Sequence, residues 1–179
     1  MAPGSLPGQA EDDLRPQPGE HPDHRRHRLS HASRLVRRFF RPRQGAVLIL
    51  LDTHVLVWQE RGDRRLGPKS RRLLEGAVKE GGAAVSAISF WEVGMRIRKG
   101  GLDLQIDLGA WRRDLLDEGL IEVPVDGAIA ARAGLLPELH GDPADRLIVA
   151  TALEGHRLMT ADRLVLDWPG PINRINATE

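Results

Sequence analysis

The chain has 179 residues, which is enough for one domain with a hydrophobic core, and its net charge is +1. It contains no cysteine, and this excludes disulfides and thiolate metal sites. No apolar run approaches the roughly 20 residues of a membrane-spanning helix and no signal-peptide pattern is present, so we expect a cytoplasmic protein without membrane contact.

Residues 1–46 differ from the rest of the chain in composition. They hold six of the 12 prolines, four of the seven histidines, nine of the 26 basic residues and five of the 25 acidic residues. Their net charge is therefore +4, against −3 for the remainder. Because this segment lacks apolar periodicity, it cannot bury enough surface to offset the entropy lost on ordering. We predict a disordered basic tail over 1–46, rich in Pro, His and Arg, followed by one domain over 47–176.

Beyond the tail, strand and helix patterns alternate. The first strand is predicted over Val47–Leu51, a continuous apolar run typical of a strand buried on both faces. Later strands are expected at 83–86, 120–123, 157–160 and 172–175. Helices are expected from about 55, from 68, from about 90, from about 108 to Gly119, after Asp126, and from 142 to about 154. Strands separated by helices predict an α/β fold, a three-layer α/β/α sandwich around a central parallel sheet.

Carboxylates follow the ends of these predicted strands. Asp52 follows the first strand, Glu92 comes shortly after the second, Asp145 lies in the segment that opens the helix at 142, and Asp162 follows the strand at 157–160. Ligands of parallel α/β sheets gather beyond the carboxyl ends of the strands, so we expect these four side chains to lie together. Their repulsion calls for a cation, and all-oxygen ligation suits Mg²⁺ or Mn²⁺. Such a cluster is typical of phosphodiester hydrolysis.

Four segments that contain these acids resemble the signature segments of PIN-domain toxins of the VapC kind. They are Leu-Leu-Asp-Thr-His-Val-Leu-Val-Trp at 50–58, Ile-Ser-Phe-Trp-Glu-Val at 88–93, Asp-Pro-Ala-Asp-Arg-Leu-Ile-Val-Ala-Thr-Ala at 142–152 and Leu-Met-Thr-Ala-Asp at 158–162. Each segment alone is a weak signal. All four in order, over about residues 47–176, are highly specific, and the predicted fold becomes a PIN-like sandwich.

The resemblance implies a metal-dependent endoribonuclease that acts as the toxin of a toxin–antitoxin pair. It implies that Asp52, Glu92, Asp145 and Asp162 are the catalytic, metal-binding residues and that the metal is Mg²⁺ or Mn²⁺. It further implies an RNA substrate, a cognate antitoxin and a homodimer. Two alternatives remain: a PIN-fold binding module without activity, and a haloacid-dehalogenase-like hydrolase, which usually needs Asp-x-Asp where this chain has Asp52-Thr53-His54.

Several neighbouring residues have more than one interpretation. Asp142 is an ideal helix N-cap or else a hydrogen-bond partner of the ligands, with Asp145 at the third helical position. Thr160 either points its hydroxyl at the site or packs in its strand. His54 is expected to face away from the site along its helix. The alternative is that it acts as a general base. Arg146 either pairs with an acid or contacts phosphate.

Glu92 also has a structural interpretation, since Ser89-x-x-Glu92 matches a capping box at a helix start. Three basic residues follow on the same helix: Arg96, Arg98 and Lys99. They could equally bind RNA phosphates, form a solvent-exposed face or bind an acidic segment of the antitoxin. Tryptophans at 58, 91 and 111 are expected in the core or in a dimer contact. The tail is expected to be dispensable, and the alternative is a basic arm that binds RNA.

Overall fold

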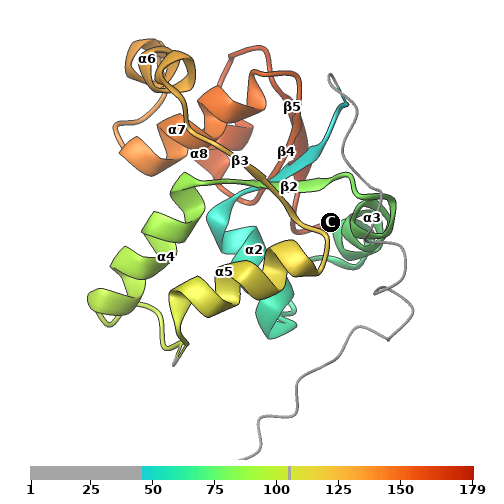
Figure 1. Cartoon of the computed structure of the whole chain (residues 1–179). Coiled ribbons are helices and arrows are strands. Elements are labelled where there is room, and N and C mark those ends of the chain that lie inside the picture. The colour runs from blue at the N-terminus through green and yellow to red at the C-terminus, as the bar shows by residue number, and fades with distance from the viewer. Residues whose placement is uncertain (1–45, 105) are drawn as a thin grey trace, which may run out of the picture.

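The computed structural model describes residues 46–104 and 106–179 (Figure 1). Its strands are β1 (Ile49–Leu51), β2 (Ala83–Ser86), β3 (Ile121–Val123), β4 (Arg157–Thr160) and β5 (Asn173–Asn176). Its helices are α2 (Thr53–Arg61), α3 (Pro68–Glu80), α4 (Ile88–Arg98), α5 (Leu108–Asp117), α6 (Gly127–Leu135), α7 (Pro143–Ala152) and α8 (Arg163–Leu166). All predicted strands and helices are confirmed within a few residues. Helix α8 was not predicted, because one turn is too short to show a helical period.

The five strands form one parallel sheet in the order β3-β2-β1-β4-β5. The chain therefore starts in the central strand, moves outward through β2 and β3, and then returns to build the other half with β4 and β5. After β1 the chain crosses to β2, and after β4 it crosses to β5, in the opposite direction. The place between these two strands is the switch point at which α/β sheets bind ligands. Asp52 and Asp162 follow these two adjacent strands.

Apolar side chains of β1 alternate between the two faces of the sheet and hold a helical layer on each side. Leu48 and Leu50 pack with side chains from α6, α7 and α8, among them Ile129, Ile148 and Val165. Ile49 and Leu51 pack with side chains from α2, α3, α4 and α5, among them Val55, Leu74, Phe90 and Leu115. Figure 1 shows the two sets of helices on opposite sides of the sheet, and the predicted three-layer α/β/α sandwich is confirmed.

The two ends of the predicted domain differ in what the structure describes. The predicted tail lies outside the described residues except for Ala46, which packs against the core cluster of α6 and α7. At the other end the fold continues past 176, since Ala177 is buried and its carbonyl accepts a hydrogen bond of 2.9 Å from Gly67. A Cβ at Gly67 would lie 2.3 Å from the carbonyl oxygen of Glu179, so this approach needs glycine. None of the helices in 46–104 and 106–179 combines the length and apolarity needed to cross a membrane.

Candidate active site

Asp52 ends β1 and is buried, with 3% of its surface exposed. Its Oδ2 accepts a 2.7 Å hydrogen bond from the Thr160 hydroxyl, and its Oδ1 lies 3.1 Å from His54 Nδ1. Burial would raise the pKa of Asp52, but hydrogen bonding from His54 and Thr160 holds that pKa below its ordinary value. The carboxylate therefore stays ionised in a buried position, as a metal ligand must.

His54 turns towards Asp52, so the expectation that it faces away is wrong. Helix α2 begins at Thr53 and not at Val55, which puts His54 in its first turn, beside the strand end. The Nε2 atom of His54 accepts a 2.9 Å hydrogen bond from the backbone N–H of Ala161. Neutral imidazole with its hydrogen on Nδ1 satisfies both contacts, so His54 ties the end of β1 to the turn after β4.

Thr160 and Asp162 complete this turn. The buried Thr160 hydroxyl donates to Asp52 and accepts a 3.0 Å hydrogen bond from the backbone N–H of Asp162. Of the two interpretations of Thr160, the one in which its hydroxyl points at the site is correct. Asp162 Oδ1 accepts a 2.7 Å hydrogen bond from the backbone N–H of Leu164 and caps α8.

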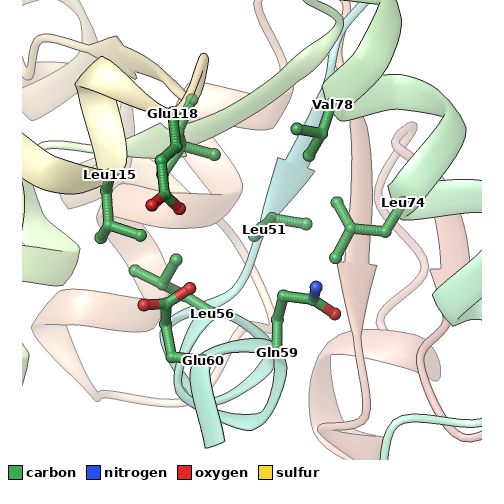
Figure 2. A pocket seen from close by; sticks show the side chains of 9 residues that line it. Leu51, Leu56, Gln59, Glu60, Leu74, Val78, Leu115 and Glu118 are labelled. Atoms are coloured by element: carbon green, nitrogen blue, oxygen red, sulfur yellow. The ribbon is translucent and has the colours of Figure 1, made fainter. Parts of the chain in front are cut away.

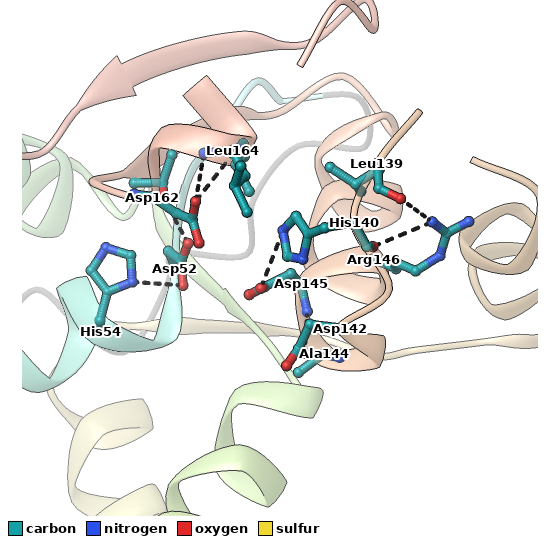
Figure 3. Close-up of polar contacts among 12 residues, drawn as sticks. Asp52, His54, Leu139, His140, Asp142, Ala144, Asp145, Arg146, Asp162 and Leu164 are labelled. Carbon is teal, nitrogen blue, oxygen red and sulfur yellow. Dashed lines mark hydrogen bonds and ion pairs between the residues drawn. The ribbon is translucent and has the colours of Figure 1, made fainter. Parts of the chain in front are cut away.

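Asp142 and Asp145 divide two tasks at the start of α7. The predicted N-cap is confirmed, because Asp142 Oδ1 accepts from the N–H groups of Ala144 at 2.9 Å and Asp145 at 3.3 Å. Partial burial raises the pKa of Asp145 to about 7, and the negative charges of nearby acids add to this effect: Asp52, Asp142, Glu92 and Asp162. Of the four acids singled out in the sequence, Asp52, Glu92 and Asp162 thus lie near enough for their charges to act on the fourth, Asp145 (Figure 3 draws three of the four).

Glu92 reaches this cluster from α4. Its Oε1 forms an ion pair of 2.8 Å with Arg96, one turn along the helix. Its Oε2 is buried and has no hydrogen-bond partner among the described residues. The capping-box interpretation is wrong, because α4 begins at Ile88 and Ser89 lies inside the first turn with its hydroxyl unpartnered.

His140 belongs to the same cluster and was not singled out in the sequence. Its Nε2 lies 3.5 Å from Asp145 Oδ2 (Figure 3). One donor atom each from His140, Asp145 and Asp162 lie within 4.8 Å of one another. The available signal was its position in the loop that leads into α7, only two residues before the capping Asp142.

Arg146 pairs with no acid among the described residues, so the expectation of an ion pair is wrong, and its guanidinium is bound to backbone carbonyls instead. Its guanidinium donates to the backbone carbonyls of Ala133 at 2.9 Å, Leu136 at 2.8 Å and Leu139 at 2.9 Å. The last carbonyls of a helix lack partners within the helix, and Arg146 supplies donors for those at the end of α6. It thereby fixes the loop between α6 and α7.

Replacing Arg146 by methionine should lower the free energy of unfolding by about 2 kcal/mol or more, because several carbonyl groups lose their donor. Urea denaturation measures this loss. The control is Arg98→Met on the exposed end of α4, which should change stability by less than about 0.5 kcal/mol. Equal effects of the two substitutions would contradict the role of Arg146.

The residues of this cluster fit a divalent cation. Without positive charge nearby it is costly to bury the ionised Asp52 and to leave a buried Glu92 oxygen without a partner. The raised pKa of Asp145 shows that a negative charge on this residue is also unfavourable. A cation among the carboxylates would relieve all three. Carboxylate oxygens are hard ligands, which suits Mg²⁺ or Mn²⁺.

A separate pocket lies in the helical layer of α2, α3 and α5 (Figure 2). It is lined mainly by apolar side chains, with Gln59, Glu60 and Glu118 as the polar ones. None of the four clustered acids, nor His54, His140 or Thr160, lines it. This pocket is therefore separate from the acids at the carboxyl ends of the strands.

Comparison with known proteins points to one family. The family described as PIN domain matches residues 49–165, a range that includes all four acids. Ribonuclease VapC22 of Mycobacterium tuberculosis is 38% identical over 117 residues, which cover 64% of this chain and 87% of that protein. A toxin–antitoxin complex from Klebsiella pneumoniae contains a chain with a TM-score of 0.50 and 23% identity, over 73% of this chain and 98% of that one. This last likeness shows a shared fold.

Proposed function

The chain belongs to the PIN domain family and is a ribonuclease of the VapC type, and we propose that it hydrolyses RNA with Mg²⁺ or Mn²⁺ held by four acids. These are Asp52, Glu92, Asp145 and Asp162. The observation that carries this proposal is the convergence of their charges around Asp145, at the switch point of the sheet. Family membership excludes the haloacid-dehalogenase-like alternative.

Each residue has a task in this proposal. When bound, the cation supplies charge neutralisation at the scissile phosphate and lowers the pKa of a water. Thr160 and His54 hold the Asp52 carboxylate in one orientation through their contacts with its two oxygens. Glu92 offers its unpartnered Oε2 to the cation. Asp145, whose raised pKa leaves it partly protonated near neutral pH, loses that proton when the cation binds. Neither a serine nor a cysteine nucleophile is needed.

The test is cleavage of RNA by the purified full-length chain in Mg²⁺, in Mn²⁺ and in a chelator. We expect cleavage with either metal, none with the chelator, and recovery when metal is restored. Cleavage that persists in the chelator would contradict the proposal. A folded protein that binds RNA but cuts none with either metal would favour the binding module.

The raised pKa of Asp145 predicts a pH dependence of the metal-free protein. The folded-state pKa of about 7 lies above the ordinary 3.8, so the folded state binds this proton more tightly than the unfolded state. The stability from this group is therefore full below about pH 4 and is lost as pH rises through 7. Asp145→Asn, which does not titrate, should raise the melting temperature most at pH 8, less at pH 5.5 and least near pH 4.

Thermal melting in a chelator, with wild type and Asp145→Asn compared at each pH, measures this effect. Comparison at equal pH removes the contributions of the other titrating groups. Adding Mg²⁺ should then raise the melting temperature of the wild type far more than that of the variant. A difference between the two proteins that does not change with pH would contradict the assignment.

The proposal includes a cognate antitoxin that inhibits the enzyme. An arginine or lysine in its C-terminal segment would take the place of the metal charge among the four acids. Expression of the chain alone should arrest growth, and co-expression of the small neighbouring gene should restore it. The Asp52→Asn variant is the control and should be harmless in both settings. Absence of toxicity from an active nuclease would favour a stand-alone enzyme.

The proposal also places the protein in the cytoplasm as a homodimer. Of the three tryptophans considered, Trp58 is buried in the core and Trp111 donates a 3.1 Å hydrogen bond to Glu60. Trp91 on α4 is 54% exposed, which leaves it free for a dimer contact. Sedimentation of the wild type and of Trp91→Ala would test this, because the variant dimer should dissociate at a higher protein concentration than the wild-type dimer.

A further inference from the structure

We propose that His140 is a nitrogen ligand of the metal and that it makes the site prefer Mn²⁺ over Mg²⁺. This inference rests on the proposed function, since it adds a ligand to the site of the four acids. It concerns a residue that the acidic signature segments do not include.

The geometry that carries the inference is the position of the His140 imidazole. Its Nε2 atom is buried and forms no hydrogen bond with the described residues. This atom faces Asp145 Oδ2 at 3.5 Å, which is ion-pair distance without hydrogen-bond geometry. One of the two imidazole nitrogens also lies within 4.8 Å of an oxygen of Asp162 (Figure 3). A buried nitrogen without a partner is costly, and a metal ion among these three donors would satisfy it.

The other two histidines of the described residues lack this combination. Both nitrogens of His54 are engaged, one with Asp52 and the other with the backbone of Ala161. His156 has a buried Nδ1 without a partner among the described residues, but it precedes β4, whereas Asp162 follows it. The two residues therefore lie at opposite ends of this strand. His156 is therefore a matched control for His140.

The loop that carries His140 is held in place from α7. Arg146, the residue after Asp145, donates to the carbonyl of Leu139 at 2.9 Å and approaches that of His140 at 3.5 Å. Glu138, two residues earlier, has a φ of 56°, the left-handed conformation that non-glycine residues rarely adopt. Such a conformation persists only when the surroundings enforce it. The loop thus presents the imidazole to Asp145 from a fixed position.

The chemistry of the donors sets the metal preference. Mg²⁺ takes oxygen ligands almost exclusively, so carboxylates alone separate Mg²⁺ from Mn²⁺ poorly. Mn²⁺ also favours oxygen ligands, but as the first member of the Irving–Williams series of transition ions it gains more from a nitrogen donor than Mg²⁺ does. A site with three or four carboxylates and one imidazole therefore gains more with Mn²⁺ than with Mg²⁺.

The experiment uses the full-length chain loaded with less than one equivalent of Mn²⁺. Pulsed electron paramagnetic resonance detects a nitrogen nucleus coupled to the bound ion, and calorimetry gives the Kd of Mn²⁺ and of Mg²⁺. We expect nitrogen coupling in the wild type and in His156→Ala, and none in His140→Ala. His140→Ala should also bind Mn²⁺ at least about tenfold more weakly, with a smaller loss for Mg²⁺.

A second variant guards against misfolding. His140→Gln keeps the length and polarity of the side chain, so it should melt like the wild type and still lose the nitrogen coupling. Coupling that is absent in the wild type, or that persists in both His140 variants, would overturn the inference while leaving the carboxylate site intact. A wild-type protein that binds neither Mn²⁺ nor Mg²⁺ would overturn this inference and the proposed metal site together.

Discussion

Replacing Asp52 by asparagine should abolish RNA cleavage and leave the fold intact. The substitution removes the buried negative charge on which the cation depends, so the rate should fall by at least ~100-fold, the upper range seen for residues that only support a metal ligand. The fold should survive, because the amide can accept from His54 and donate to the Thr160 hydroxyl, which already lies at 2.7 Å. Loss of a buried charge also removes a desolvation cost.

Cleavage rates across a Mg²⁺ and Mn²⁺ titration, with circular dichroism of the same samples, measure this prediction. The control is Asp114→Asn on the exposed face of α5, which makes the same chemical change and should leave the rate unchanged. If Asp52→Asn cuts RNA at the wild-type rate in saturating Mg²⁺, then Asp52 is not a ligand.

The paired aspartates of α7 should separate into one catalytic and one structural residue. Asp145→Ala should stop cleavage, because it removes the carboxylate around which the other charges gather. Asp142→Ala should retain activity and lose about 1 kcal/mol of stability, because it removes the cap that accepts from two backbone N–H groups. The two substitutions are chemically identical and lie three residues apart.

Rates and urea denaturation of both variants decide this prediction. Asp126→Ala is the matched control, since Asp126 caps α6 through a 2.9 Å hydrogen bond from Ile129 and lies outside the cluster. It should match Asp142→Ala in lost stability. An inactive Asp142→Ala beside an active Asp145→Ala would reverse the assignment of ligand and cap.

The elements that the sequence predicted well are those with local signals. A continuous apolar run set β1, Pro68 opened α3, and the caps Asp126 and Asp142 opened α6 and α7. Each signal depends on residues within a turn or a strand of one another, so no knowledge of packing is needed. Parallel connectivity then placed the acids at one edge of the sheet, because every such strand ends on the same side.

Partners distant in sequence decided the rest of the site. Thr160 and Asp52 are 108 positions apart, as the end of β4 meets the end of β1. His54 faces its acid because α2 begins at Thr53, and Arg146 binds backbone carbonyls that α6 brings to it. His140 approaches Asp145 only through the fixed loop before α7. The pattern of strands and acids was enough to predict which acids meet, but only the packing of separate elements sets side-chain direction, so that His54 and His140 approach these acids and Arg146 does not.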